Sequence, residues 1–348
     1  MSRTTPPRPV DVTAVFPQLA PLVRTATRLH PRPGSPTPHD SSVGGPLLWP
    51  ADEPWPHCDG PHVWDQVNAP LSPEDVRLQR RIQAAVASRP HGIPETARYT
   101  PEEQATNERI NAGHPWPVGP IAMLPVAQLY GRDVPLLRPP GRFGADLLQV
   151  LWCPFDHPAH PRTALFWRSV AAVTDVLYTP PEPPAVQFPG YLPEPCLLEP
   201  EQVTEYPHVM ELSTELQQQL GDWSTWQTAG AAVDSYYAPA PQELYTDKLS
   251  IAPGWKAGGW TRWGLTDPVP RVCSACGTEA EPLLTIATTE WGAGTDNWAP
   301  EEDQANPTAT LPGYPPANYT MIDLARGYDL QLHVCPASPD HPHIELIQ

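Results

Sequence analysis

Cysteine and histidine residues in the C-terminal part of the chain have the spacing of a metal site. Cys273-Ser-Ala-Cys276 is followed by glycine, which permits a tight turn that brings two thiolates within reach of one zinc ion. A tetrahedral site needs two further ligands, for which Cys335 and either His341 or His343 are available. We therefore predict a structural zinc site formed by Cys273, Cys276, Cys335 and His341. The alternative is a set of reduced cysteines that remains from a lost site.

A second group of the same residue types lies in the N-terminal half. Cys58 has His62 close by, but Asp59 and Gly60 follow it where a second cysteine would be expected. Cys153 is followed by histidines, the nearest of which is His157. These residues predict a second metal site formed by Cys58, His62, Cys153 and His157. The alternative is that the N-terminal half has lost its metal site. Cys196 lies outside both groups and is expected to behave as a small apolar residue.

The chemistry of these groups is typical of structural metal rather than catalysis. Catalytic zinc keeps one coordination position open and is usually held by three histidine or carboxylate ligands, whereas thiolate-rich sites tend to be closed. The sequence contains no HExxH motif, no GxSxG motif, no P-loop and no dinucleotide-binding glycine pattern. No catalytic residue is therefore assigned, and the sequence favours a protein that is not an enzyme.

The landmarks around the two cysteine groups occur twice in the same order. A Gly-Gly pair is followed by tryptophan, proline and cysteine over residues 44–58 and again over residues 258–273. An apolar segment ending in Cys-Pro occupies residues 148–154 and 330–336, and each copy is followed by Asp-His-Pro. This order indicates an internal duplication in which Cys58 corresponds to Cys273 and Cys153 to Cys335.

Spacing within the repeat locates a helical insertion. Cys58 and Cys153 are 95 residues apart but Cys273 and Cys335 only 62, so the first half carries 33 extra residues. Ser72-Pro-Glu-Asp and Thr100-Pro-Glu-Glu each predict a helix start, and Pro90 and Gly113 predict the ends. A third helix is expected over Val209–Leu220, before Gly221. Strands are expected over Leu147–Trp152, Ala164–Val170, Leu283–Ala287 and Leu330–Val334.

These elements predict a β-rich α+β fold with an internal duplication and helical insertions. The expected organisation is an N-terminal lead-in over residues 1–35, a first half over 36–170 with its insertion at about 72–113, a proline-rich connector with a helix over 171–244, and a second half over 245–348. The 52 prolines among 348 residues argue against helical bundles and coiled coils, because proline is poorly tolerated inside helices and central strands.

Charge and composition limit the classes of partner. The formal net charge is −18, with 21 basic and 39 acidic residues, and no cluster of cations is present that could follow a phosphate backbone. Neither a signal peptide nor a long apolar run is visible, so the sequence predicts a cytoplasmic protein that binds neither nucleic acid nor membrane. An acidic surface suits a basic protein partner.

Tryptophans gather around the two Gly-Gly pairs. Trp49, Trp263 and Trp291 are candidates for a partner-binding groove, because tryptophan is favoured at interfaces. The alternative is that they fill the core of a proline-rich fold. Their occurrence in both halves favours the structural role.

The ordered set of motifs resembles the YwqG-like family (DUF1963), a bacterial family of unassigned function. The similarity covers most of the chain and includes Glu205-Tyr-Pro in the connector, the Cys-x2-Cys-Gly motif and the Cys-Pro at residue 335. It implies a duplicated fold of coiled β-sheets. A more distant likeness in the motifs connects the chain to the eukaryotic programmed-cell-death-2 group, whose members chaperone a ribosomal protein and carry zinc-type cysteines.

The sequence is compatible with two classes of function. The first is a non-catalytic cytoplasmic factor that binds a protein partner, as an adaptor, a chaperone or a toxin-immunity protein does. The second is a metal-dependent hydrolase that uses the histidines near Cys153 and Cys335. The binding class predicts closed metal sites whose loss destabilises the fold, and the hydrolase class predicts an exchangeable metal.

Overall fold

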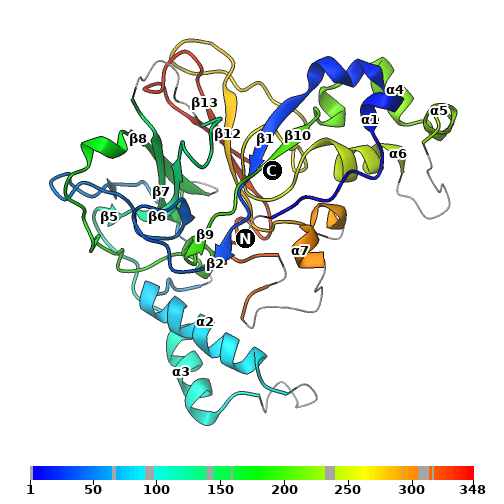
Figure 1. The fold of residues 1–348 in the computed structure, drawn as a ribbon. Coiled ribbons are helices and arrows are strands. Elements are labelled where there is room, and N and C mark those ends of the chain that lie inside the picture. Colours follow the sequence, from blue (N-terminus) through cyan, green and yellow to red (C-terminus); the bar gives the residue numbers. More distant parts are fainter. Residues whose placement is uncertain are drawn as a thin grey trace.

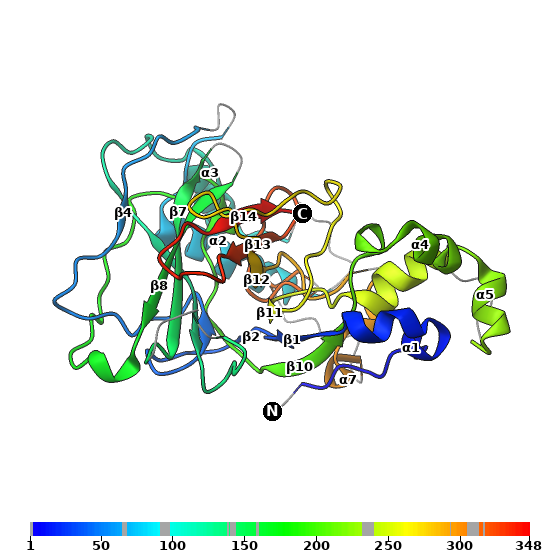
Figure 2. The same ribbon diagram turned by 90° about the horizontal axis from the view of Figure 1, so that it is seen from above.

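The computed structural model describes most of the chain as an α+β fold built on two antiparallel sheets. It describes residues 3–64, 68–90, 98–137, 139, 144–157, 160–231, 240–292, 294–304, 313–315 and 317–348. The α+β class predicted from the sequence is confirmed. Figure 2 shows β7 and β8 on one side of the molecule, helices α1, α4 and α5 on the other, and β12 to β14 between them.

Each sheet has six strands. The first has the order β10-β1-β11-β12-β13-β14, formed by Glu201–Glu205, Arg24–Arg28, Lys256–Gly258, Glu281–Ile286, Leu330–Val334 and Ile344–Ile347. The second has the order β2-β9-β3-β6-β7-β8, formed by Arg32–Pro33, Cys196–Leu197, Ser42–Val43, Leu124–Tyr130, Leu147–Asp156 and Pro161–Arg168. A small third sheet pairs β4 (His57–Cys58) with β5 (Ile121–Ala122). All four strands expected from the sequence are present, with ends that differ by a few residues.

The order of strands repeats between the two sheets. In each, the strand before the Gly-Gly pair (β3 or β11) is followed by an apolar strand (β6 or β12), the Cys-Pro strand (β7 or β13) and a final strand (β8 or β14). β9 lies on the other side of β3 and follows the first half in sequence. β1 lies on the other side of β11 and precedes the first half. β1 thus precedes the first half but joins the sheet of the second, and β9 precedes the second half but joins the sheet of the first, an arrangement that we call a strand exchange.

The exchange also joins the outer strands of the two sheets. β1 pairs with β10 and β2 pairs with β9, so the chain passes from one sheet to the other at residues 29–31 and again at 198–200. One continuous apolar core lies between the sheets and includes Val126 and Val150 from the second sheet and Leu284 and Leu332 from the first. Because the segments before the two halves each supply one strand to both sheets, we expect the two halves to fold as one unit.

The predicted insertion is a helical hairpin that projects from one end of the molecule (Figure 1). It consists of α2 (Pro73–Ala87) and α3 (Pro101–Asn111). Ser72 Oγ accepts a hydrogen bond from the backbone N–H of Asp75, and Thr100 and Glu103 form a capping box. Gly113 follows α3 with φ of +66°, which ends the helix without strain. Residues 91–97 between the helices lie outside the described residues.

A second group of helices lies at the opposite end and has its own apolar core. It contains α1 (Val12–Val15), α4 (Thr214–Leu220), α5 (Trp223–Thr228), α6 (Pro241–Glu243) and the π-helix η6 (Leu244–Ser250), which pack around Phe16 and Trp226. The single helix expected over Val209–Leu220 is divided into a 3-10 turn and α4, because Ser213 caps a new helix start. The remaining short elements are η1 (Pro17–Leu22), η3 (Val170–Ala172), η4 (Pro189–Tyr191), η5 (Val209–Glu211), η7 (Asp296–Trp298) and α7 (Glu301–Gln304).

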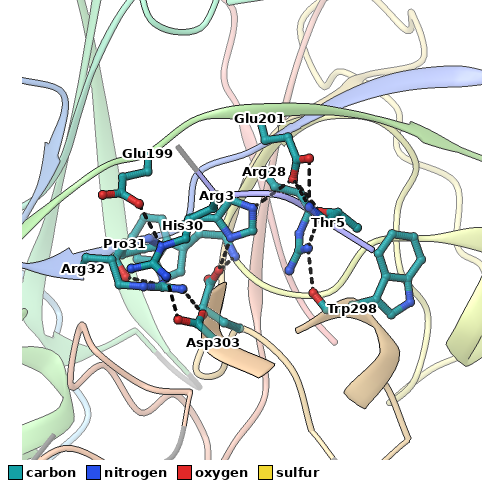
Figure 3. Close-up of polar contacts among 12 residues, drawn as sticks. Arg3, Thr5, Arg28, His30, Pro31, Arg32, Glu199, Glu201, Trp298 and Asp303 are labelled. Atoms are coloured by element: carbon teal, nitrogen blue, oxygen red, sulfur yellow. Dashed lines mark hydrogen bonds and ion pairs between the residues drawn. The ribbon is translucent and has the colours of Figure 1, made fainter. Parts of the chain in front are cut away.

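Where the chain passes between the sheets, a charged network ties the N-terminal segment to the fold (Figure 3). His30 is fully buried, and its ring nitrogens lie 3.3 Å from Glu201 and 3.5 Å from Glu290. Thr5 donates to Glu201, and Arg28 donates to Thr5 Oγ1 and to the carbonyl of Trp298. Around this centre Arg3 and Arg32 pair with Asp303, and Arg3 also pairs with Glu199. Charges that would be costly to bury alone are therefore paired here.

A buried ion pair supports the exchanged strand in the first sheet. The Nζ of Lys256 lies 2.7 and 2.8 Å from the two carboxylate oxygens of Glu205, and both side chains are about 1% exposed or less. The backbone N–H groups of Ala252 and Trp260 also donate to this carboxylate. A Cβ on Gly259 would lie 2.2 Å from it, so glycine is required there. This explains the second glycine of this pair: the chain at Gly259 approaches a buried charge closely.

Lys256→Met should destabilise the protein by about 3–5 kcal/mol, because it leaves the Glu205 carboxylate buried without its counter-ion. Urea denaturation would measure the change in the free energy of unfolding. Lys248→Met is the matched control, since Lys248 pairs with the exposed Asp296 and should change stability by less than about 1 kcal/mol. Equal effects of the two substitutions would contradict a special role for the buried pair.

His208 should make stability depend on pH. Burial lowers the pKa of His208 to about 4, below the value of about 6.5 expected in the unfolded chain. The folded state therefore binds fewer protons between these values, and stability should fall as the pH is lowered from about 6.5 to 4. His208 Nδ1 accepts from the N–H of Met210, a bond that asparagine can also accept. His208→Asn should therefore show a shallower loss of stability than the wild type, measured by urea denaturation across this pH range.

Candidate metal centres

The C-terminal group forms a compact cluster at the end of β13. Cys273 and Cys276 lie on a tight turn in which the N–H of Gly277 donates to the carbonyl of Cys273 and the N–H of Cys273 donates to the carbonyl of Thr278. Gly277 has φ of +75°, the left-handed conformation that the sequence pattern implied. Cys335 directly follows β13, and a turn over residues 338–341 returns His341 to the thiols. The turn that carries Cys273 and Cys276 thus supplies two ligands, and the segment that follows β13 supplies the other two.

The distances in this cluster fit one tetrahedral ion. His341 Nδ1 lies 3.3 Å from Cys335 Sγ and 3.6 Å from Cys273 Sγ, and the sulfurs of Cys276 and Cys335 are 3.4 Å apart. A tetrahedral zinc ion would place two sulfur ligands about 3.8 Å apart and a sulfur and a nitrogen ligand about 3.5 Å apart. The four donor atoms all lie within 4.8 Å of one another. The four residues predicted from the sequence are therefore brought together and could hold a metal ion.

His343, the other candidate, lies outside the cluster. Its Nε2 is 2.7 Å from Thr163 Oγ1 on β8, and Glu345 also accepts from this hydroxyl at 2.6 Å. His160 Nδ1 lies 3.7 Å from the same carboxylate. These residues join the last strands of the two sheets, and a cavity of about 430 Å³ opens beside them, lined in part by His341 and Trp167. Of the two candidate histidines, His341 is therefore the one that lies with the three cysteines.

The N-terminal group forms a second cluster at the corresponding place. Cys153 lies in β7 and Cys58 in β4, and Gly60, with φ of +89°, turns the chain so that His62 returns towards Cys58. His157 follows β7. The donor atoms of Cys58, His62, Cys153 and His157 all lie within 4.8 Å of one another. This set could also hold a metal ion, so the weaker of the two sequence patterns leads to an equally compact group.

The pKa values of the two histidines in the N-terminal cluster favour neutral imidazole rings. Burial lowers the pKa of His157 to about 4 and also lowers that of His62, so both rings are in the form that coordinates metal. His157 Nε2 is 3.4 Å from Cys58 Sγ, and the buried Nε2 of His62 has no hydrogen-bond partner among the described residues. Burial and the neighbouring Cys58 raise the pKa of Cys153. A cation would satisfy the orphaned nitrogen and stabilise the thiolates.

The two clusters differ in their access to solvent. In the N-terminal cluster Cys58 and Cys153 are both buried. In the C-terminal cluster Cys273 and Cys335 are buried, but Cys276 is exposed. Hydrogen bonding by Thr278 is the main cause that lowers the pKa of Cys276 to about 6. The C-terminal cluster therefore presents one thiolate to solvent even though its other sulfurs are shielded.

The predicted tryptophan groove is corrected by the structure at two of its three residues. Trp49 is 1% exposed and Trp263 is 3% exposed, so neither offers a surface to a partner. Trp49 packs against Trp55 and Phe166 under the guanidinium of Arg168. Trp263 lies beneath Arg271. They fill the core next to the Gly-Gly pairs, as the alternative predicted, and only Trp291 is partly exposed.

Two features near the surface were missed by the sequence analysis. Trp64 and Trp116 stack with centroids 5.1 Å apart beside the N-terminal cluster, where Trp64 also contacts the ring of His62. A cavity of about 530 Å³ lies between α2 and the Gly44-Gly45 turn, and arginines from one face of α2 line it. The spacing of Arg77, Arg80 and Arg81 is a helical signal that could have indicated this wall.

Comparisons with known proteins assign the chain to no family. No protein-family model matches the sequence, and no curated protein matches it significantly. The resemblance to the YwqG-like family therefore stays a prediction. No helix in the described part of the chain has both the length and the apolar character needed to span a lipid bilayer.

Metal content should separate the two clusters. The wild type should bind two zinc ions per chain, and Cys273→Ser and Cys153→Ser should each bind one, because each removes a ligand from a different cluster. Inductively coupled plasma mass spectrometry on the purified chains would measure this stoichiometry. Cys196→Ala is the matched control, since Cys196 is a buried cysteine outside both clusters and should leave two ions bound. A wild type with no bound zinc would refute both sites.

Proposed function

We propose that the protein is a non-catalytic zinc protein whose role is to bind another protein. The observation that carries this proposal is that each cluster brings four protein donors together. Four donors complete a tetrahedral shell, so no position remains for a substrate or a reactive water. A metal ion held in this way stabilises structure and does not activate a ligand.

The positions of the ligands support a stabilising role. Each set joins the Cys-Pro strand of a six-stranded sheet to a segment far away in sequence: Cys153 of β7 lies beside Cys58 of β4, and Cys335 after β13 lies beside Cys273. Because such a site forms only in the folded chain, the energy of metal binding adds to the energy of folding.

The charge of the chain supports a basic partner. The formal net charge is −18, and many of its cations are already engaged within the fold, as in the pairs that Arg32, Arg168 and Lys256 make with acidic side chains. The remaining surface is therefore strongly acidic, which favours association with a positively charged protein. An adaptor, a chaperone and a toxin-immunity protein would each use such a surface.

One observation favours a metal-dependent hydrolase as the second candidate. The cavity of about 430 Å³ beside His341 and His343 lies next to the Glu345 carboxylate, where acid and base groups face an open space. A hydrolase at this place would need a metal ion with an open position. It predicts that metal exchanges readily and that its removal leaves the fold intact.

Removal of metal should distinguish the two candidates. Incubation with a strong zinc chelator should lower the melting temperature of the wild type by roughly 10 °C or more, because a structural site contributes several kcal/mol to folding. Differential scanning calorimetry before and after chelation, and again after zinc is restored, measures the shift. An unchanged melting temperature after complete zinc loss would contradict the structural role and favour the hydrolase.

The binding role is tested in the native host. The tagged protein, isolated gently and analysed by native mass spectrometry, should carry a second chain in stoichiometric amount. That complex should dissociate as the salt concentration rises, since salt screens exposed charges. A complex that is insensitive to salt would contradict a partner held by charge, and a chain that is always isolated alone would contradict the binding role.

A further inference from the structure

The two clusters are related by the internal repeat but differ at one ligand. Cys58 corresponds to Cys273, Cys153 to Cys335 and His157 to His341, so the remaining ligands, His62 and Cys276, correspond to each other. The first half therefore has a histidine where the second half has a thiol. That thiol is also the one exposed cysteine of the protein, all six cysteines being described.

The exposed thiol has a second sulfur within reach. Cys276 Sγ lies 3.4 Å from Cys335 Sγ, so a small change in side-chain rotamer would bring the two sulfurs to bonding distance. Cys335 is 1% exposed, so it is shielded from reagents in solvent while Cys276 is not. An exposed thiol beside a shielded resolving thiol is the arrangement found in cysteines that are oxidised reversibly.

We propose that Cys276 is an oxidation site, at which a peroxide converts the Cys276 and Cys335 thiolates to a disulfide and releases zinc from the C-terminal cluster. This inference rests on the proposed zinc site. The N-terminal cluster keeps its zinc, because both of its cysteines are buried and a half-buried histidine takes the place of the exposed thiol.

The chemistry balances with hydrogen peroxide as the oxidant. The Cys276 sulfur attacks one peroxide oxygen, the O–O bond breaks, and a sulfenic acid forms while the other oxygen leaves as water after taking a proton from solvent. The Cys335 thiolate then attacks the sulfenic sulfur, the S–S bond forms, and the S–O bond breaks to release hydroxide, which takes a proton from solvent to give a second water. The two sulfurs lose two electrons in total, and one peroxide is reduced to two waters.

Loss of two of its four ligands removes the ion from the C-terminal cluster. Cys273 and His341 alone hold zinc weakly, so the ion passes to solvent. The disulfide then takes the place of the metal ion in joining the turn that carries Cys273 and Cys276 to the end of β13. Reduction of the disulfide in the presence of zinc restores the original site.

The experiment uses the full chain loaded with two zinc ions and treated with hydrogen peroxide in the presence of a chromophoric zinc chelator. One zinc per chain should be released, at a rate about ten-fold or more above that of the other. Peptide mapping by mass spectrometry should find a Cys276–Cys335 disulfide, and a reductant with added zinc should reverse both changes. Release of both ions at one rate, or release without this disulfide, would overturn the proposal.

Cys276→His is the matched variant, because it gives the second half the ligand set of the first. It should still bind two zinc ions and should resist release by peroxide, whereas Cys196→Ala should respond as the wild type does. A Cys276→His chain that binds two ions and releases one as fast as the wild type would overturn the proposal. If the wild type holds no zinc, the proposed function fails, and disulfide mapping of the same chain alone decides the oxidation site. If Cys276→His does not fold, the wild-type disulfide map decides.

Discussion

The exchange of one strand between the two halves is the constraint on which the rest of the structure depends. β1 comes before the first half but completes the sheet of the second, and β9 comes before the second half but completes the sheet of the first. Neither sheet can form its full hydrogen-bonded ladder from one half alone, because each needs strands from the segments that precede the two halves. The single core between the sheets, the buried charges at the crossing and the glycine pairs beside the exchanged strands all follow from this arrangement.

The candidate metal centres are consequences of the same architecture. In each half the Cys-Pro strand is held rigidly inside a sheet, and this fixes one thiol in space. A loop from earlier in the half brings a second thiol, and a turn after the strand brings a histidine. The fold thus builds the same four-ligand arrangement twice. The two copies differ in the residue at the exposed corner, which is where the two halves can differ in chemical behaviour.

Much of the fold and of both sites could be predicted from the sequence, because the relevant signals are local or repeated. Cysteine spacing and the matched landmarks selected all eight ligands, and caps such as Ser72 and Thr100 located the helix starts. The strand exchange could not be predicted, because β9 is two residues long and neither β1 nor β9 carries a motif. The tryptophans were ambiguous because the same ring suits a core or an interface, and only packing decides between them. The joining of β8 to β14 through Glu345 depends on tertiary contacts that no local pattern encodes.

The central claim is that two closed sites hold zinc with protein ligands alone. X-ray absorption spectroscopy at the zinc edge of the fully loaded chain tests it most directly. The clusters contain five sulfur and three nitrogen donors in total, so the account predicts a four-coordinate average shell of 2.5 sulfurs and 1.5 nitrogens per zinc. A shell of five or six ligands rich in oxygen would contradict the account, because it would show that water reaches the metal.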